Sequence, residues 1–220
     1  PEVIAAWAAA NGAAMFHYST DYVFDGSGKA PWKESDPTNP INAYGESKRR
    51  GDEAVLASGA AFLVMRTSWV YAAHGQNFLR TMLRLGSERS ELRVVADQIG
   101  APTSANLLAD TTVEIIRSAT DDLPTLLNAR GGIVNVTPSG ETSWHGFAEA
   151  IFTSARQRDM PLQIQRVEPI PSSEYPLPAT RPLNSRLALE TVRDKFGMVM
   201  PSWQETLESV LDEVVSRTRL

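Results

Sequence analysis

Tyr44 and Lys48 are the pair of residues in this sequence whose types and spacing best suit proton transfer. They lie four positions apart in a segment predicted to be helical, and side chains with that spacing share one face of a helix. An ammonium beside a phenol favours the phenolate, so such a tyrosine can exchange a proton with a substrate oxygen. The same spacing also occurs by chance in exposed helices, so the pair needs support from other residues.

Small polar residues upstream of the pair supply that support. Residues 13–19 form a short, largely apolar run, which predicts a buried parallel strand that ends in the Ser-Thr-Asp of residues 19–21. Ligands of open α/β sheets bind outside the carboxyl ends of the strands. A hydroxyl at this strand end and the helix with Tyr44 and Lys48 would together polarise a carbonyl group. Thr20 and Asp21 could instead only cap a turn, but the combination favours the site.

The composition limits the classes of protein to consider. The chain has 220 residues, 42% of them hydrophobic, which is enough for one large domain or two small ones. A net charge of −5 without a long basic cluster argues against a nucleic-acid-binding surface. No run of 18 uncharged apolar residues is present that would span a membrane. The absence of cysteine excludes disulfides, thiol nucleophiles and cysteine metal sites, and it agrees with a cytoplasmic setting.

The order of predicted elements indicates the fold class. Strand and helix patterns alternate, which favours an α/β fold with parallel strands. Residues 169–182 carry five prolines and are predicted to be irregular. Ser202 and Glu205 form a capping box at the start of the last helix. The first predicted helix, residues 1–10, has Val3, Ile4 and Trp7 on one face. Further helices are predicted around Tyr44 and Lys48 to about residue 57, at 77–85, at 107–119 and at 144–156, the last with Ser143 as its N-cap. Strands are predicted at 15–19, 61–66, 92–96 and 133–136.

Two kinds of site have no support in the sequence. The three histidines, His17, His74 and His145, lack the spacing of metal ligands and are interpreted as structural residues. No Gly-x-Gly-x-x-Gly turn occurs, although a dinucleotide-binding sheet normally begins with one. The first predicted elements, a helix and then a strand, are typical of the middle of a doubly wound sheet. The sequence therefore predicts an N-terminal truncation, with the glycine-rich turn before Pro1.

Five motifs together resemble one family. They are Ser-Thr-Asp-Tyr-Val-Phe-Asp-Gly at 19–26, Tyr-x-x-x-Lys at 44–48, Arg-Thr-Ser-Trp-Val-Tyr at 66–71, Asp-Gln-x-Gly-x-Pro-Thr at 97–103 and Arg-Pro-x-Asn-Ser-Arg-Leu at 181–187. This set resembles the dTDP-4-dehydrorhamnose reductases of the extended short-chain dehydrogenase/reductase family over essentially the whole chain. The resemblance implies a Rossmann-like doubly wound parallel sheet, its first part missing, with a smaller C-terminal substrate-binding domain. The implied division assigns residues 1–70 and 105–137 to the NAD(P)-binding domain, and 71–104 and 138–220 to the substrate-binding domain.

The resemblance also implies an activity and a set of catalytic residues. The activity would be the NADPH-dependent reduction of the C4 ketone of dTDP-4-dehydro-L-rhamnose to dTDP-L-rhamnose. Tyr44 matches the catalytic tyrosine that donates a proton to the keto oxygen. Lys48 matches the lysine that tunes the tyrosine and binds the nicotinamide ribose, and Thr20 matches the hydroxyl of the triad. Tyr18 matches a residue that contacts the cofactor.

Substrate-binding residues are implied in the same way. Thr20, Asp21 and Trp69 match positions that contact the substrate, and the ring of Trp69 is interpreted as a stacking platform for the sugar. Arg181 and Arg186 would either clamp a diphosphate, whose geometry suits guanidinium groups, or fix the proline-rich segment. The remaining tryptophans at helix starts, Trp144 and Trp203, are interpreted as packing residues.

The resemblance implies a cofactor and partners, but it leaves the choice of cofactor and the oligomeric state open. NADPH is the expected cofactor, with NADH as the alternative, because the residues that choose between them would precede Pro1. The partners would be a dTDP-sugar substrate and, for a homodimer rather than a monomer, a second copy of the chain. Some family members form dimers through magnesium bound to glutamates. Asn106 replaces one such glutamate, while Glu213 matches another. The neutral amide of asparagine is a poorer ligand for a hard cation such as magnesium than a carboxylate is. We therefore expect no tight magnesium site.

Two other functions stay open at this point. One is a nucleotide-sugar epimerase or dehydratase of the same family. A dehydratase usually needs an additional acid after the threonine and aspartate, and Tyr22 occupies that position. The other is a non-catalytic NADP-binding regulatory subunit, like the related β-subunit of methionine adenosyltransferase. The presence of Thr20, Tyr44 and Lys48 argues against lost catalysis.

Overall fold

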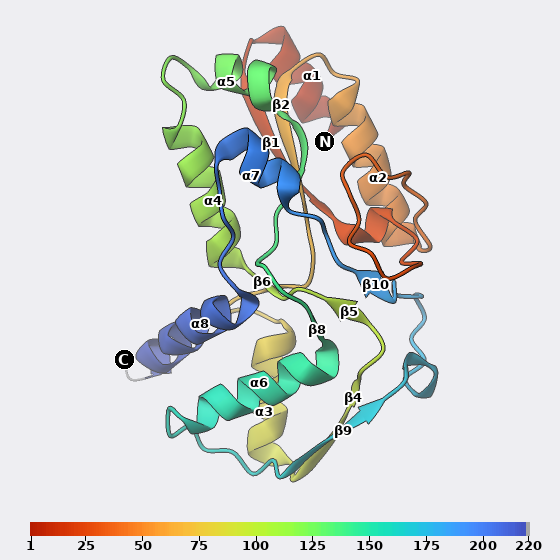
Figure 1. The fold of residues 1–220 in the computed structure, drawn as a ribbon, viewed down its shortest axis with the longest axis vertical. Helices are drawn as coiled ribbons and strands as arrows, with labels where there is room; N and C mark the ends of the chain where they lie inside the picture. Colours follow the sequence, from red (N-terminus) through yellow and green to blue (C-terminus); the bar gives the residue numbers. More distant parts are fainter. Residues whose placement is uncertain (219–220) are drawn as a thin grey trace.

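A parallel three-stranded sheet forms the centre of the larger half of the molecule (Figure 1). The structure is a computed structural model that describes residues 1–218. The strands β1 (Ala14–Thr20), β2 (Ala61–Thr67) and β7 (Gly132–Asn135) lie in the order β1-β2-β7, with Thr20 opposite Thr67 at the carboxyl ends of β1 and β2. The α/β class with parallel strands is confirmed.

Helices cover both faces of this sheet. On one face, α1 (Glu2–Ala10) and α2 (Ala43–Leu56) bury Ala5, Ala8 and Val55 against the strands. On the other face, α4 (Ala105–Arg117), α5 (Leu123–Arg130) and α7 (Glu190–Phe196) enclose a second apolar cluster that includes Leu63 and Met65 of β2. The predicted apolar face of α1 is not in the core: Val3, Ile4 and Trp7 are 82%, 62% and 61% exposed.

A separate core lies in the lower part of Figure 1. It is formed by α3 (Phe78–Glu88), α6 (Trp144–Arg156) and α8 (Trp203–Thr218), together with β4 (Glu91–Val95) and its parallel partner β9 (Arg166–Ile170). The buried members of this core all belong to residues 71–104 and 138–220, whereas α7, which the predicted division places in the same domain, packs against β7. The division into two domains stays a prediction.

Short strands join the two halves. β5 (Ile99–Gly100) pairs in parallel with β10 (Asn184–Ser185) and antiparallel with β8 (Thr142–Ser143), and β3 (Val70–Tyr71) pairs with β6 (Thr103–Ser104). These pairings bring the Asn-Ser of the 181–187 motif beside the glycine of the 97–103 motif. Two motifs that are far apart in the sequence therefore lie together between the halves.

The prediction of an irregular segment at residues 169–182 is wrong at its start. β9 extends to Ile170, and a 3₁₀ turn, η2, follows at Ser172–Glu174. Pro169 lies opposite Val94 of β4. The strand tolerates this proline because β4 and β9 form a two-stranded ribbon, in which each strand has an unpaired edge. Within residues 1–218, no helix is both long and apolar enough to cross a membrane.

Candidate active site

A cavity of about 650 Å³ opens at the carboxyl ends of β1 and β2. Parallel strands end at one edge of the sheet, so the polar residues that follow β1 and β2 meet there, as the sequence predicts. The cavity contains every predicted site residue except Arg186. Its walls are formed by Tyr18, Ser19, Thr20, Asp21, Tyr22, Tyr44, Lys48, Thr67, Ser68, Trp69, Val70, Ala105, Leu108, Ala109, Trp144 and Arg181.

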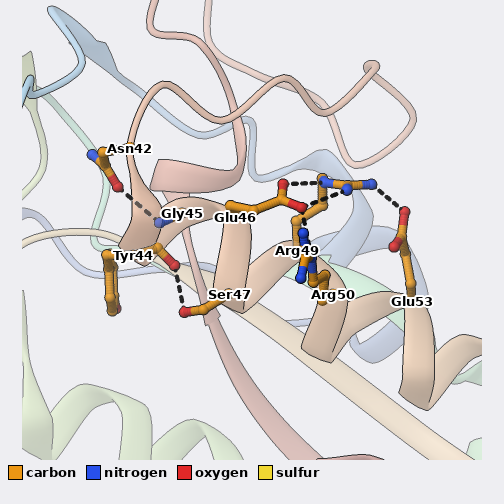
Figure 2. A network of polar contacts seen from close by, with 8 residues as sticks. All are labelled: Asn42, Tyr44, Gly45, Glu46, Ser47, Arg49, Arg50 and Glu53. Carbon is orange, nitrogen blue, oxygen red and sulfur yellow. Dashed lines mark hydrogen bonds and ion pairs between the residues drawn. The ribbon is translucent and has the colours of Figure 1, made fainter.

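The first turn of α2 places Tyr44 at the cavity. Asn42 caps the helix: its Oδ1 accepts a hydrogen bond from the Gly45 N–H at 2.8 Å (Figure 2). A Cβ atom on Gly45 would lie 2.1 Å from the carbonyl oxygen of Tyr22, so only glycine allows this close approach. The rings of Tyr22 and Tyr44 meet edge to face, with centroids 5.5 Å apart. Tyr44 is 55% exposed, which leaves its phenol accessible from the cavity.

Lys48 connects the same face of α2 to β1. Its Nζ donates a hydrogen bond to the carbonyl oxygen of Tyr18 at 2.5 Å. The phenol of Tyr18 is hydrogen-bonded to Thr112 of α4 at 2.7 Å. Lys48 therefore has a fixed position one turn after Tyr44, and two of its three N–H groups are left for other acceptors.

Thr20 and Asp21 begin a short 3₁₀ turn, η1 (Asp21–Val23). The Oγ1 of Thr20 accepts from the Tyr22 N–H at 3.2 Å and donates to Oδ1 of Asp21 at 3.1 Å. The threonine thus caps a turn and lines the cavity at once. Asp21 is 1% exposed, and its Oδ2 forms no hydrogen bond within the described residues 1–218. Burial raises the pKa of Asp21 to about 7, against the opposing effects of the Ser185 hydroxyl and, to a smaller extent, the Thr20 hydroxyl.

Two stacked tryptophans form the wall of the cavity opposite α2. Trp69, whose φ is +50°, stacks on Trp144 with ring centroids 3.8 Å apart and planes 14° apart. A Cβ atom on Gly100 would lie 3.0 Å from the Trp69 ring, so this glycine of the 97–103 motif makes room for the indole. One face of Trp69 is therefore covered by Trp144, and the two rings form a single aromatic surface.

The two predicted arginines have different surroundings. Arg181 lines the cavity and also a neighbouring cavity of about 750 Å³, and it forms no hydrogen bond or ion pair with another residue among 1–218. Arg186 lines neither cavity. Its guanidinium is paired with the carboxylate of Glu141 at 2.5 and 3.1 Å and donates to Oδ1 of Asn184 at 3.1 Å. The guanidinium of Arg186 is therefore held by protein groups, and its predicted contact with a diphosphate stays a prediction.

Comparison with known proteins decides the family. The family model of the RmlD substrate binding domain matches residues 1–216. The dTDP-4-dehydrorhamnose reductases of Burkholderia thailandensis and Escherichia coli K12 are 46% and 45% identical to this chain, over 98% and 100% of its length and 72% of theirs. The chain belongs to the dTDP-4-dehydrorhamnose reductase family.

Solved structures of reductases from this family have the same fold. The crystal structure of an ortholog from Clostridium acetobutylicum matches with a TM-score of 0.87 and 35% identity, covering 98% of this chain and 71% of that chain. The Bacillus anthracis reductase, in complex with NADP, matches with a TM-score of 0.85 and 34% identity over 96% and 70%. The predicted Rossmann-like fold class is confirmed.

Asn106, where the resemblance implies that a magnesium-binding glutamate is replaced, does not line the cavity. Nδ2 of Asn106 donates to Oε2 of Glu213 at 3.2 Å, and this hydrogen bond, with the nearby Arg217, lowers the pKa of Glu213. The two residues that the resemblance paired are thus in contact, as an amide and a carboxylate. Within the described chain, no group of three or more histidines and carboxylates could hold a metal ion.

Trp144 lines the candidate site, although the sequence predicts only a packing role for it. It lines both cavities, and its Nε1 donates a hydrogen bond to Oε1 of Gln98 at 3.1 Å. Gln98 in turn donates to Ser172 at 2.9 Å. The only signal in the sequence was its position directly after the N-cap Ser143, which says nothing about the cavity. Its role follows from the stacking on Trp69, which only the tertiary structure shows.

Proposed function

We propose that this protein reduces the C4 ketone of dTDP-4-dehydro-L-rhamnose to dTDP-L-rhamnose with NADPH, a reaction of dTDP-rhamnose biosynthesis. The observation that carries the proposal is the gathering of Thr20, Tyr44 and Lys48 around one cavity at the ends of parallel strands. Membership of the reductase family supports it, as does the crystal structure of the Bacillus anthracis reductase in complex with NADP.

The cavity has the features that the nicotinamide end of the cofactor requires. In the part of the chain that the structure describes, the buried hydroxyls of Ser19 and Thr67 on the cavity wall have no hydrogen-bond partner. Polar groups of a bound ligand would satisfy them. Lys48 has N–H groups left for ribose hydroxyls, and Tyr18 lies beside it. Apolar wall residues, among them Leu108, suit the face of a nicotinamide ring. NADPH is the proposed cofactor, with NADH as the alternative.

The chemistry of the chain's own residues is the handling of one proton. NADPH, when bound, supplies the hydride that reduces C4. Tyr44 donates its phenolic proton to the C4 oxygen as that oxygen gains negative charge, and Thr20 donates a hydrogen bond to the same oxygen. The Lys48 ammonium stabilises the phenolate that remains. Because Tyr44 is half exposed, solvent can restore its proton after each turnover.

Substrate binding uses the opposite wall in this proposal. The sugar lies between η1 and the edge of the aromatic surface of Trp69 and Trp144. Asp21, neutral in a large share of molecules near pH 7, can donate a hydrogen bond to a sugar oxygen. The nucleotide extends into the neighbouring cavity. Arg181 borders both cavities and forms no hydrogen bond or ion pair with another residue among 1–218, and its guanidinium binds the diphosphate between them.

Location and assembly belong to the same proposal. A cytoplasmic setting agrees with the lack of cysteine. The protein acts as a monomer or a homodimer and needs no magnesium, so EDTA should leave both its activity and its oligomeric state unchanged. Size-exclusion chromatography and rate measurements with and without the chelator test this, and a metal-dependent dimer would contradict it.

The test of the function is NADPH oxidation with dTDP-4-dehydro-L-rhamnose, with the product identified by mass spectrometry. We expect one dTDP-L-rhamnose per NADPH consumed, and no oxidation with dTDP-glucose, which has no ketone. Conversion without net NADPH consumption would indicate an epimerase or dehydratase instead. NADPH binding without any conversion by a folded protein would indicate the non-catalytic regulatory subunit.

A further inference from the structure

A buried ion pair lies behind the catalytic face of α2. Nε of Arg66, the next-to-last residue of β2, is 3.2 Å from Oδ2 of Asp52 on α2, and both side chains are 4% exposed. The other carboxylate oxygen of Asp52 lies 3.4 Å from Nε2 of His17 on β1. One carboxylate thus connects α2 to both strands whose ends form the cavity.

Asp52 lies on the helix face that carries the proposed proton donor. Tyr44, Lys48 and Asp52 are spaced at intervals of four, so they follow one another along one side of α2. That side contacts the rest of the protein at three levels. Gly45 touches the Tyr22 carbonyl in the first turn, Lys48 binds the Tyr18 carbonyl in the second, and Asp52 binds Arg66 in the third.

Arg66 is itself held from several sides. Its guanidinium carbon lies 5.2 Å from the centre of the Phe24 ring, and its Nη1 donates to the carbonyl oxygen of Glu34 at 3.3 Å. The carboxylate of Glu34 accepts hydrogen bonds from the Asn135 N–H and the Thr191 hydroxyl, both at 2.8 Å. The guanidinium therefore has one position, and it fixes the carboxylate of Asp52 in turn.

Stability alone does not account for a pair of this kind. Two charges taken out of water lose hydration free energy about as large as their mutual attraction, and well-packed apolar replacements are often as stable. What an apolar pair lacks is direction, because hydrophobic contact tolerates small rotations and shifts of a helix. A hydrogen-bonded ion pair does not tolerate such rotations and shifts, because its hydrogen bonds depend on direction.

We propose that Arg66 and Asp52 are positioning residues whose pair fixes the rotation and depth of α2, and thereby the place of Tyr44 and Lys48 against Thr20. The proposal rests on the proposed function, in which Tyr44 donates the proton. Proton transfer requires hydrogen-bond distance, and a misplacement of about 1 Å costs on the order of a hundredfold in rate.

The deciding variant is the double replacement Arg66→Met with Asp52→Leu, which keeps side-chain volume and removes both charges together. We expect it to melt near the wild-type temperature, to keep KM for the sugar within about threefold, and to lose roughly 10–100-fold in kcat. The control is Arg158→Met, which removes a guanidinium paired with Glu208 and Asp212, away from the cavity. The control should change the melting temperature without changing kcat.

A readout that does not depend on activity separates this proposal from the proposed function. Hydrogen exchange at the amides of residues 45–48 should be faster in the double variant than in the wild type, and unchanged in Arg158→Met. If the wild type reduces no sugar, the function fails and the exchange rates still test the positioning. A folded double variant with wild-type kcat and exchange rates would overturn the proposal.

Arg66→Lys keeps the proposal testable if the double variant does not fold. Lysine retains the charge but lacks the planar fork of the guanidinium. We expect a folded protein with kcat reduced roughly 3–10-fold at an unchanged KM. Wild-type kcat in this variant would overturn the proposal.

Discussion

The two sides of α2 both carry ion pairs, but the pairs differ in what they connect. On the outer side, Glu46 binds Arg49 and Arg50, and Arg49 also binds Glu53, all within the helix (Figure 2). On the inner side, Asp52 binds Arg66 of another element, and both side chains are buried. The outer pairs stabilise a helix that would have the same position without them, whereas the inner pair determines where the helix lies.

This difference separates stability from function on one helix. Exposed pairs at i,i+3 and i,i+4 are screened by water and salt and contribute little. In the proposed mechanism, the inner contacts of Tyr44, Gly45 and Lys48 with β1 and η1 place the Tyr44 phenol beside the C4 carbonyl of the substrate. Substitutions on the inner side should therefore change the rate, and substitutions on the outer side should change only the melting temperature.

Tyr44→Phe should have the largest effect, because it removes the proposed proton donor itself. A positioned acid contributes roughly two to four orders of magnitude in rate, so kcat should fall by that factor. The phenyl ring keeps the edge-to-face contact with Tyr22, so the melting temperature and NADPH affinity should change little. NADPH oxidation rates and a cofactor titration measure both. Turnover near the wild-type level would remove Tyr44 from the mechanism.

Gly45→Ala should have the next largest effect, through position alone. Its methyl group would meet the Tyr22 carbonyl oxygen at 2.1 Å, so the start of α2 must move away from η1. A displacement of about 1 Å between Tyr44 and Thr20 predicts roughly a hundredfold loss in kcat. The control is Ser47→Ala, two residues along on the exposed side, where kcat should stay unchanged. Equal kcat values for the two variants would show that the close approach of Gly45 to the Tyr22 carbonyl does not affect the rate.

The sequence predicted those parts of the site that follow local rules. Tyr44 and Lys48 share a face because of helical periodicity, and Thr20 lies beside them because polar residues follow a buried strand. The pairing of Arg66 with Asp52, and of Trp69 with Trp144, follows no spacing rule. Each joins residues from different elements, and which elements meet is decided by packing of the whole chain.

The fold was predictable to a similar extent, for the same reason. Helices and strands with clear periodicity were found within a few residues of their observed ends, and helix 144–156 with its cap at Ser143 was correct. The strands of two residues that join the halves, such as β5 and β10, were missed because they exist only through their partners. The helix at Leu123–Arg130 was also missed, since it shows little amphipathic pattern.

Asp21→Asn should have a smaller effect, on stability, that depends on pH. Burial raises the pKa of Asp21 from 3.8 to about 7, so between those values the unfolded chain ionises while the folded protein keeps its proton. Folding therefore becomes less favourable as pH rises through this window, and the cost is fully present above about pH 7. The asparagine variant lacks this cost. Its stability relative to wild type should rise by about 2–4 kcal/mol between pH 4 and pH 8, measured by urea unfolding.

A matched variant is the control for this pH dependence. Asp25 lies in the same loop region but is exposed, and a hydrogen bond from Ser27 lowers its pKa instead. Asp25→Asn should therefore give no gain in stability as pH rises from 4 to 8. A difference between wild type and Asp21→Asn that stays constant over this range would show that Asp21 ionises normally.

Removing the outer ion pairs of α2 should have the smallest effect, and this effect should be on the melting temperature and not on kcat. Replacing Glu46 with Gln removes the negative charge that pairs with both Arg49 and Arg50, yet the melting temperature should fall by less than about 2 °C and kcat should not change. Hydrogen bonds from these arginines lower the pKa of Glu46 to about 2. The stabilisation is thus present above about pH 4.5, is lost as pH falls towards 2, and weakens with added salt. A loss of kcat in Glu46→Gln as large as that in Gly45→Ala would mean that both sides of α2 position Tyr44.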